Sequence, residues 1–312
     1  MDIKPYRIDI HHHILPPEYL SSLAKIDIIT VDNTNFPPWN PEQSLALMDR
    51  QNIAIAVTSI SSPGIFFGDI EFTKNLARLC NNYSANLIKK YPNRFGSLAI
   101  LPLPDIEASL HELEYALDTL KLDGVGMLTN IKGKYIGDPE FEDLFSALNR
   151  RNTVVFIHPN SPPQEKLPSL NFPSAVLEYV FDTTRALANL LYNNVFQKYK
   201  NIKFIFAHAG GTAPYIAWRI TFGNKRLQKY FKRLYYGTAL SATKNVFRSL
   251  MELVDTSHIL FGSDFPFVHE IVVKEMIQEI VNNEDFDLNT RFMIEQKNAL
   301  TLFPRLRSFI NI

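Results

Sequence analysis

Three consecutive histidines, His11, His12 and His13, follow a short apolar run near the start of the sequence. Alternate side chains of an extended strand share a face, so His11 and His13 point to one side and His12 to the other. Two neutral imidazoles on one face can bind a single divalent cation. The alternatives are a solvated strand end or a fragment of an expression tag. The run stops at three and continues directly into patterned sequence, which argues against a tag and favours a metal site.

Three further ionisable residues each follow an apolar run of strand-like sequence. His158 ends the apolar run within VVFIHP, His208 ends the run within KFIFAHAGG, and Asp264 comes shortly after the run within ILFGSDFP. Taken singly, either histidine could be a hydrogen-bonded core residue, and Asp264 could be a turn residue or helix cap. Together with His11 and His13 they offer mixed nitrogen and oxygen ligands with room for water or substrate, as a catalytic metal requires.

The elements that would position these residues are eight short β-rich runs separated by helical segments. Most of the runs are continuously apolar, which is typical of strands covered on both faces. Eight strand–helix repeats predict an α/β fold, a (β/α)8 TIM barrel with its active site at the carboxyl ends of the strands. Because no linker or low-complexity segment interrupts residues 1–312, we expect one domain. The long connections 14–40, 61–70 and 159–173 are expected to cover the site. The strands are expected at 7–11, 53–59, 95–100, 124–128, 154–158, 203–207, 234–237 and 259–262.

Composition limits the classes of partner. Lys plus Arg and Asp plus Glu each number 32, so zero formal charge gives no reason to expect nucleic acid or an anionic membrane as a partner. One cysteine, Cys80, lies in a helical pattern beside Leu76 and Leu79, where it is expected in the core. No leader pattern or membrane-spanning run is recognisable, and a cytoplasmic protein is expected.

The constellation resembles the amidohydrolase superfamily over essentially the whole chain. The segments HHHILPPEY, FGSLAILPLPD, VFIHPNSPP, FAHAGGTAPY, FGSDFP and NALTLFP occur in the order that this superfamily shows. They are similar to the branch that holds aminocarboxymuconate-semialdehyde decarboxylase and the aromatic-acid decarboxylases, above all to its 6-methylsalicylate-decarboxylase-like members. The resemblance implies a metal-dependent enzyme with a metal-dependent-hydrolase type of barrel. It also implies a homodimer, by analogy.

Carried onto this sequence, the resemblance assigns the metal ligands and the proton-handling group. The ligands would be His11, His13, His158 and Asp264, and His208 would be catalytic beside them, with Asp264 also a possible proton relay. Superfamily members with two metals usually carry a bridging lysine at the end of strand four. Here that position falls at residues 128–130, and the nearest lysines, Lys132 and Lys134, lie in the following loop. One divalent ion is therefore expected, zinc first and manganese as the alternative.

Three residues are candidates for substrate binding. The planar guanidinium of Arg185 could pair with a substrate carboxylate, although an ion pair with Asp182 on the same helix is equally compatible with the sequence. Phe67 belongs to an aromatic loop, 65–67, that could exclude bulk water from the site. Asn130, at the end of strand four, is the third candidate.

The favoured function is metal-dependent, non-oxidative decarboxylation of a small hydroxylated aromatic or related unsaturated carboxylic acid. Hydrolysis of a lactone, amide or ester by the same ligands is the alternative. A catalytically silent metal-binding protein is a third hypothesis. It rests on Gly237, where the family commonly has Asp before TALSA. The segment NFPPW at 35–39 also lacks the arginine that semialdehyde decarboxylases carry there, which argues against that substrate.

Overall fold

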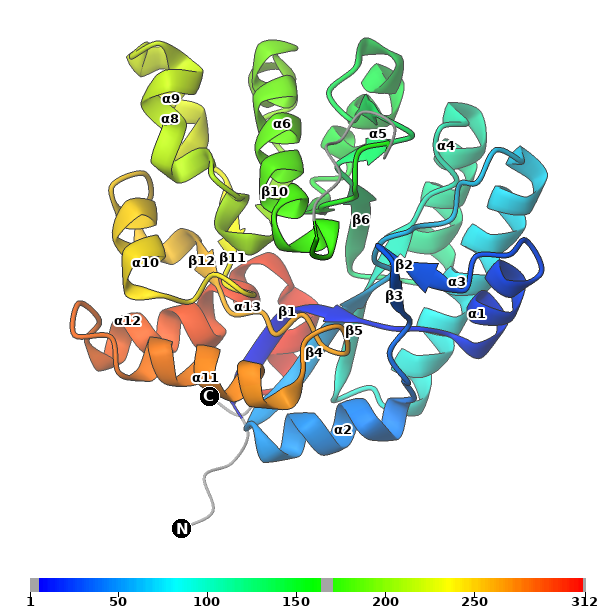
Figure 1. Ribbon diagram of the computed structural model, residues 1–312, viewed down its shortest axis with the longest axis horizontal. Helices are drawn as coiled ribbons and strands as arrows, with labels where there is room; N and C mark the ends of the chain where they lie inside the picture. The colour runs from blue at the N-terminus through cyan, green and yellow to red at the C-terminus, as the bar shows by residue number, and fades with distance from the viewer. Residues whose placement is uncertain (1–5, 164–170, 311–312) are drawn as a thin grey trace.

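The computed structural model describes residues 6–163 and 171–310 of the chain, so the predicted domain ends and part of the loop 159–173 lie outside the described residues. Eight parallel strands form one sheet (Figure 1). The last strand returns to the first, because the Ile10 amide donates to the Phe261 carbonyl at 3.0 Å and the Asp264 amide to the His11 carbonyl at 2.8 Å. The predicted (β/α)8 barrel is confirmed. In sheet order its strands are β1 (Arg7–His13), β4 (Ile53–Ser59), β5 (Phe95–Ile100), β6 (Gly124–Leu128), β9 (Val154–His158), β10 (Lys203–Phe206), β11 (Tyr235–Gly237) and β12 (Ile259–Leu260).

Helices surround the barrel, and several of them begin at a side-chain cap. The side chain of Asn40 accepts from the Gln43 amide before α2, and Asp105 accepts from the Ala108 amide before α4. Asp138 caps a 3-10 turn, Pro139–Phe141, and α5 begins directly after this turn. The α-helices are α1 (Pro17–Ala24), α2 (Pro41–Arg50), α3 (Ile70–Lys90), α4 (Ile106–Glu114), α5 (Glu142–Arg150), α6 (Glu178–Tyr192), α7 (Val195–Lys198), α8 (Ala213–Thr221), α9 (Lys225–Phe231), α10 (Lys244–Met251), α11 (Glu270–Val281), α12 (Leu288–Phe292) and α13 (Asn298–Leu302).

Among the described helices, none combines the length and the apolar composition needed to cross a membrane.

Two small hairpins stand on the connections that follow the first and fourth barrel strands. One joins β2 (Thr30–Val31) to β3 (Thr34–Asn35), and the other joins β7 (Asn130–Ile131) to β8 (Lys134–Tyr135). Both turn residues of each hairpin have positive φ, as the tight two-residue hairpin turns require. Each hairpin thereby presents a side chain from its tip, Asp32 in the first and Lys132 in the second.

The barrel interior is filled by one buried apolar cluster, and a second cluster lies between the strands and the surrounding helices. Ile8, Ile10 and Phe156 belong to the interior cluster together with Leu300 and Phe303, so the C-terminal segment closes the amino end of the barrel. The ladder between β1 and β4 shifts register between Asp9 and His12. One extra residue in β1 at this point reverses the alternation of faces. Ile8 and Ile10 therefore face the interior before the irregularity, and His11 and His13 face it afterwards.

Candidate metal centre

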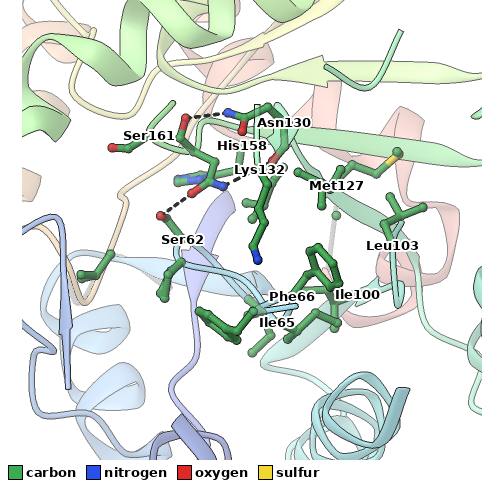
Figure 2. Close-up of a pocket in the computed structure, with 18 of the residues that line it drawn as sticks. Ser62, Ile65, Phe66, Ile100, Leu103, Met127, Asn130, Lys132, His158 and Ser161 are labelled. Carbon is green, nitrogen blue, oxygen red and sulfur yellow. Dashed lines mark hydrogen bonds between the residues drawn. The ribbon is translucent and has the colours of Figure 1, made fainter. Parts of the chain in front are cut away.

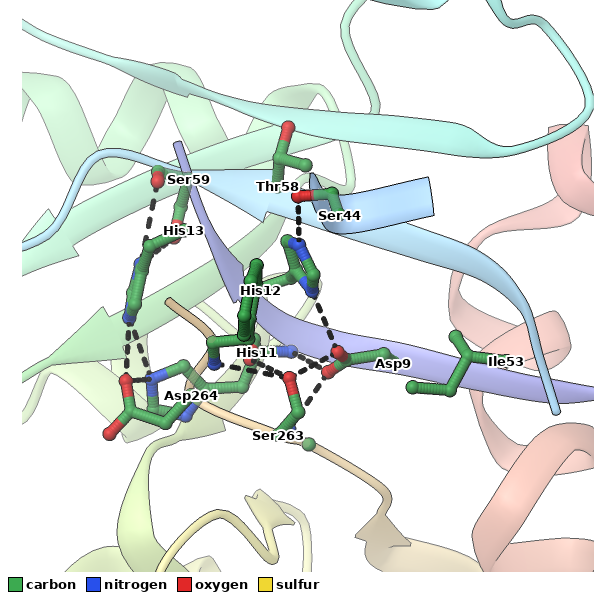
Figure 3. A network of polar contacts seen from close by, with 12 residues as sticks. Asp9, His11, His12, His13, Ser44, Ile53, Thr58, Ser59, Ser263 and Asp264 are labelled. Carbon is green, nitrogen blue, oxygen red and sulfur yellow. Dashed lines mark hydrogen bonds and ion pairs between the residues drawn. The ribbon is translucent and has the colours of Figure 1, made fainter. Parts of the chain in front are cut away.

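Four predicted ligands converge at the carboxyl end of the barrel. One ligand atom from each of His11, His13, His158 and Asp264 lies within 4.8 Å of the others, and all four residues are buried. The Nε2 atoms of His11 and His13 are 2.9 Å apart, and they lie 3.2 and 3.0 Å from Asp264 Oδ1 (Figure 3). The predicted opposite orientation of His12 is also confirmed, since its ring points toward α2.

The outer ring nitrogens of two ligands are held by neighbouring groups. His158 Nδ1 donates to the carbonyl of Pro159 at 2.8 Å, and His13 Nδ1 lies 3.1 Å from the hydroxyl of Ser59. A donor at Nδ1 leaves Nε2 as the lone-pair nitrogen, which is how protein groups commonly orient a metal-binding imidazole. His158 Nε2 is buried and has no hydrogen-bond partner among the described residues. Such an orphaned acceptor, facing two further imidazoles and a carboxylate, fits one divalent cation.

Burial and mutual contact favour the metal-binding protonation states of His11, His158 and Asp264. Burial lowers the pKa of His11 to about 4 against the opposing effect of Asp264, and it lowers the pKa of His158 well below its usual value. Burial alone would raise the pKa of Asp264. The charge of His11 and hydrogen bonds from His11, His13 and His208 outweigh it and hold the pKa well below the usual range. Neutral imidazoles and an ionised carboxylate are the ligand forms that divalent cations need.

A buried carboxylate that the sequence analysis missed, Asp9, holds the ligand strand against the loop that carries Asp264. It accepts from the His11 amide at 3.1 Å, from His12 Nδ1 at 3.0 Å and from both the amide and hydroxyl of Ser263 at 3.0 and 2.5 Å (Figure 3). His12 Nε2 contacts the hydroxyl of Ser44 on α2 at 2.8 Å. His12, which lies between the two ligands in sequence, thus anchors the outer side of β1 to α2. The signal in the sequence that could have identified Asp9 is its position two residues before the His-X-His pattern.

His208 stands beside the ligands and shares their carboxylate. Its Nε2 lies 3.2 Å from Asp264 Oδ2, while Oδ1 of the same residue faces His11 and His13. The backbone of His208 has positive φ and runs into a turn at Gly211, where an added Cβ would lie 2.0 Å from the Val180 carbonyl. The turn aims a buried imidazole at the site from the end of β10.

An open cavity of about 770 Å³ adjoins the metal centre (Figure 2). It reaches the ligands at His158 and at Ser59, the partner of His13. The described parts of the three connections predicted to cover the site all contribute to its walls, together with residues at and just after the carboxyl ends of the barrel strands. The apolar wall is formed chiefly by Ile60, Ile65, Phe66, Phe67, Ile100, Leu101, Leu103, Met127 and Leu128.

The three substrate-binding candidates occupy different places. Phe67 and Asn130 line the cavity. Asn130 is also a brace, because its amide nitrogen donates to Asp182 at 2.9 Å and its oxygen accepts from the Gly133 amide at 2.8 Å. Arg185 is not among the cavity-lining residues. Its guanidinium lies 3.4 Å from Glu178 and 3.9 Å from Asp182, the ion pairing that the sequence analysis gave as the alternative.

Asp32 and Tyr179 also escaped the sequence analysis, and together they join the β2–β3 hairpin to α6. The Asp32 carboxylate accepts from the hydroxyls of Tyr179, Ser161 and Ser174, the last two at 2.5 and 3.0 Å. The ring of Tyr179 lies against two site histidines, 6.0 Å from the His158 ring centroid and 6.5 Å from that of His208. Two hydrophilic residues about 150 positions apart give no pattern from which this contact could have been read.

The barrel and its strand-end ligands define a metal-binding α/β-barrel protein, and comparison with known proteins gives the family. The amidohydrolase family model matches residues 8–305. The chain is 31% identical over 323 residues to the 6-methylsalicylic acid decarboxylase of Penicillium expansum, covering 98% of both proteins. It is 26% identical to the 2-amino-3-carboxymuconate-6-semialdehyde decarboxylase of Dictyostelium discoideum, over 94% of this chain and 90% of that protein. The chain belongs to the amidohydrolase family, as the sequence motifs indicated.

Solved structures share the fold. A 2,6-dihydroxybenzoate decarboxylase in complex with 2,6-dihydroxybenzoate superposes with a TM-score of 0.82 at 21% identity, covering 97% of this chain and all of that one. A dihydroxybenzoic acid decarboxylase from Polaromonas sp. JS666, with bound manganese and the inhibitor 2-nitroresorcinol, gives 0.81 at 20% identity over 97% of both chains. At these identities the likeness establishes the barrel architecture.

Proposed function

We propose that this protein is a metal-dependent carboxy-lyase that removes carbon dioxide from a small hydroxylated aromatic acid. One observation carries the proposal: an imidazole, His208, shares the carboxylate of Asp264 with the candidate metal ligands, and a largely apolar cavity reaches this cluster at His158. The similarity to named decarboxylases over 98% of the chain supports the same class of reaction.

The chemistry divides among the residues of the site. A divalent ion held by His11, His13, His158 and Asp264 would supply Lewis-acid polarisation of a carboxylate and an adjacent oxygen. The His208 imidazole would deliver a proton to the ring carbon that bears the carboxylate, and the carbon–carbon bond then breaks to release carbon dioxide. Asp264 Oδ2 would hold that imidazole in position. The Phe67 wall would keep bulk water from the leaving carboxylate.

A solvent-isotope experiment tests the reaction class. Metal-loaded protein is incubated with 6-methylsalicylate or 2,6-dihydroxybenzoate in deuterated water, with metal-depleted protein as the control. Carbon dioxide release with one deuterium at the carbon that lost it is expected. A parallel panel of lactones, amides and esters is run in ¹⁸O-labelled water. Incorporation of labelled oxygen without carbon dioxide would overturn the decarboxylase in favour of the hydrolase.

The proposal includes zinc as the native metal, because three imidazoles and one carboxylate form a donor set that zinc accepts readily. Elemental analysis of protein purified without added metal tests this, and one equivalent of manganese in its place would refute it. Arg185 stays in the proposal as a residue that orients a carboxylate. Arg185→Lys is then expected to raise KM with the metal content unchanged. A cytoplasmic location, tested by cell fractionation, also stays part of the proposal.

We also propose that two copies of the chain associate through an exposed aromatic face of α8. Tyr215, Trp218 and Phe222 are 86, 71 and 83% exposed on and just after this helix. Tyr192, from the neighbouring α6, is 53% exposed, and its hydroxyl donates to the Ile220 carbonyl at 2.6 Å, which joins the two helices. Several exposed aromatic side chains on neighbouring helices are typical of an interaction site, and self-association about a twofold axis would bury them on both copies.

A further inference from the structure

Lys132 is a cation that projects into the cavity from the tip of the β7–β8 hairpin (Figure 2). Its Nζ lies 5.1 Å from the ring centroid of Phe66. The other lysine of this hairpin, Lys134, forms an ion pair with Glu140, whereas Lys132 forms none with a carboxylate in residues 6–163 and 171–310. Asp32, the one acid among the described cavity-lining residues, is already bound by three hydroxyl groups.

The hairpin holds this lysine in a defined place. Lys132 and Gly133 both have positive φ, which fixes the tight turn. Asn130 braces the turn by accepting from the Gly133 amide, and it is itself anchored on the buried carboxylate of Asp182. Gly68 lies beside the ammonium and leaves space for it, because a Cβ there would come within 3.2 Å of Lys132 Nζ. The backbone of the β7–β8 hairpin therefore determines where the charge of Lys132 lies.

The surroundings of the ammonium favour an anionic group of the ligand. Ile65, Phe66, Leu103 and Met127 line the same cavity, so a ligand that enters displaces water from around Lys132. A charge-assisted hydrogen bond is stronger where water is excluded than at an open surface. At about 770 Å³ the cavity also exceeds what a monosubstituted benzoate needs, which leaves space for a further ring substituent.

We propose that Lys132 is a specificity-determining residue that binds a second carboxylate of the substrate, so that the preferred substrates are hydroxylated aromatic diacids. The carboxylate beside the phenolic oxygen leaves at the metal centre, and the second carboxylate stays on Lys132 and in the product. This inference rests on the proposed function, because it assumes that the first carboxylate is bound at the metal centre.

Matched substrates test the assignment. Salicylate carries one carboxylate, whereas 4-hydroxyisophthalate and 2-hydroxyterephthalate add a second at different ring positions. We expect at least one diacid to exceed salicylate in kcat/KM by about tenfold, equivalent to about 1.4 kcal/mol. Lys132→Met should raise KM for that diacid by a similar factor and leave salicylate unchanged. Lys134→Met, on the same hairpin, is the control and should change neither. Equal effects on both acids, or no effect, would overturn the assignment.

A binding measurement separates this inference from the reaction class. Metal-loaded His208→Asn protein, with the proton-handling imidazole removed, is titrated calorimetrically with salicylate and with each diacid, with and without Lys132→Met. Tighter binding of a diacid that Lys132→Met abolishes would support the assignment even if no carbon dioxide were released by the native enzyme. Binding of the diacids that is insensitive to Lys132→Met would refute it, whatever reaction the native enzyme catalyses.

Discussion

Among single residues, Asp264 has the largest share of the proposed chemistry, because one oxygen faces two ligand histidines and the other faces His208. Asp264→Ala should therefore abolish stoichiometric metal binding. Ser59→Ala, which removes a hydroxyl that orients His13, should weaken metal affinity by about 10-fold to 100-fold, the usual worth of such outer contacts. Ser257→Ala is the matched control, since Ser257 contacts Nδ1 of His258 outside the ligand cluster. Metal titration checks all three, and full metal retention in Asp264→Ala would contradict the ligand assignment.

His208 is predicted to act on protons and not to hold the metal. His208→Asn should keep the metal and lose about 10²–10⁴-fold in kcat, the range for removing a general acid or base. His258→Asn, a substitution of the same type at the amino end of β12, should leave kcat unchanged. Steady-state kinetics and metal analysis are made on the same samples. A parallel loss of metal and activity would make His208 a ligand.

Some elements could be predicted from the sequence and others could not. The difference depends on how many residues the hydrophobic pattern of an element covers. All eight barrel strands were predicted because each is a short β-rich run, and most of these runs are continuously apolar and buried on both faces. The five strand-end residues followed from that frame. The hairpins were missed because strands of two residues contain no periodicity, and their function depends on single contacts of Asp32 and Lys132. The predicted ends of β10 and β12 lie one and two residues beyond the observed ends, although the Ala207 amide still donates to the Ile157 carbonyl and the Phe261 carbonyl accepts from the Ile10 amide.

The β2–β3 hairpin is predicted to depend on Asp32 for its position over the cavity. Asp32→Asn removes the charge that three hydroxyls share and should speed amide hydrogen exchange in residues 30–35. KM should rise more than kcat falls, since the cavity wall loosens while the ligands stay in place. Tyr179→Phe should add little to the effect of Asp32→Asn, because both remove the same contact. Asp27→Asn, at an exposed position in the same connection, is the control. Fully additive effects of the two substitutions would show that the contact does not act as one unit.

For the whole molecule, the buried histidines predict how the stability of the metal-free protein depends on pH. The pKa of His11 falls to about 4 in the folded chain, from an ordinary value near 6.5. The unfolded chain therefore binds the extra proton between these values, and stability is lost as pH falls from about 6.5 toward 4. Asp264, whose pKa is lowered from about 3.8, adds no loss in this window because it is ionised in both states. Thermal melts at pH 7, 6 and 5 test this, and a smaller pH dependence in His11→Asn is expected. An unchanged slope in that variant would mean that His11 does not contribute.

The exposed aromatic face of α8 carries the prediction for assembly. Light scattering on a sizing column should give twice the chain mass of 35.8 kDa for the native protein. Tyr215→Arg with Trp218→Arg should give the single-chain mass, because charge on a buried twofold contact opposes association. Leu288→Arg, at a residue 81% exposed outside this face, is the control and should leave the mass doubled. Unchanged metal content and melting temperature would show that the arginine variant is folded. A native protein that elutes at the single-chain mass at micromolar concentration would refute the pairing, and a doubled mass in the arginine variant would place the contact on another face.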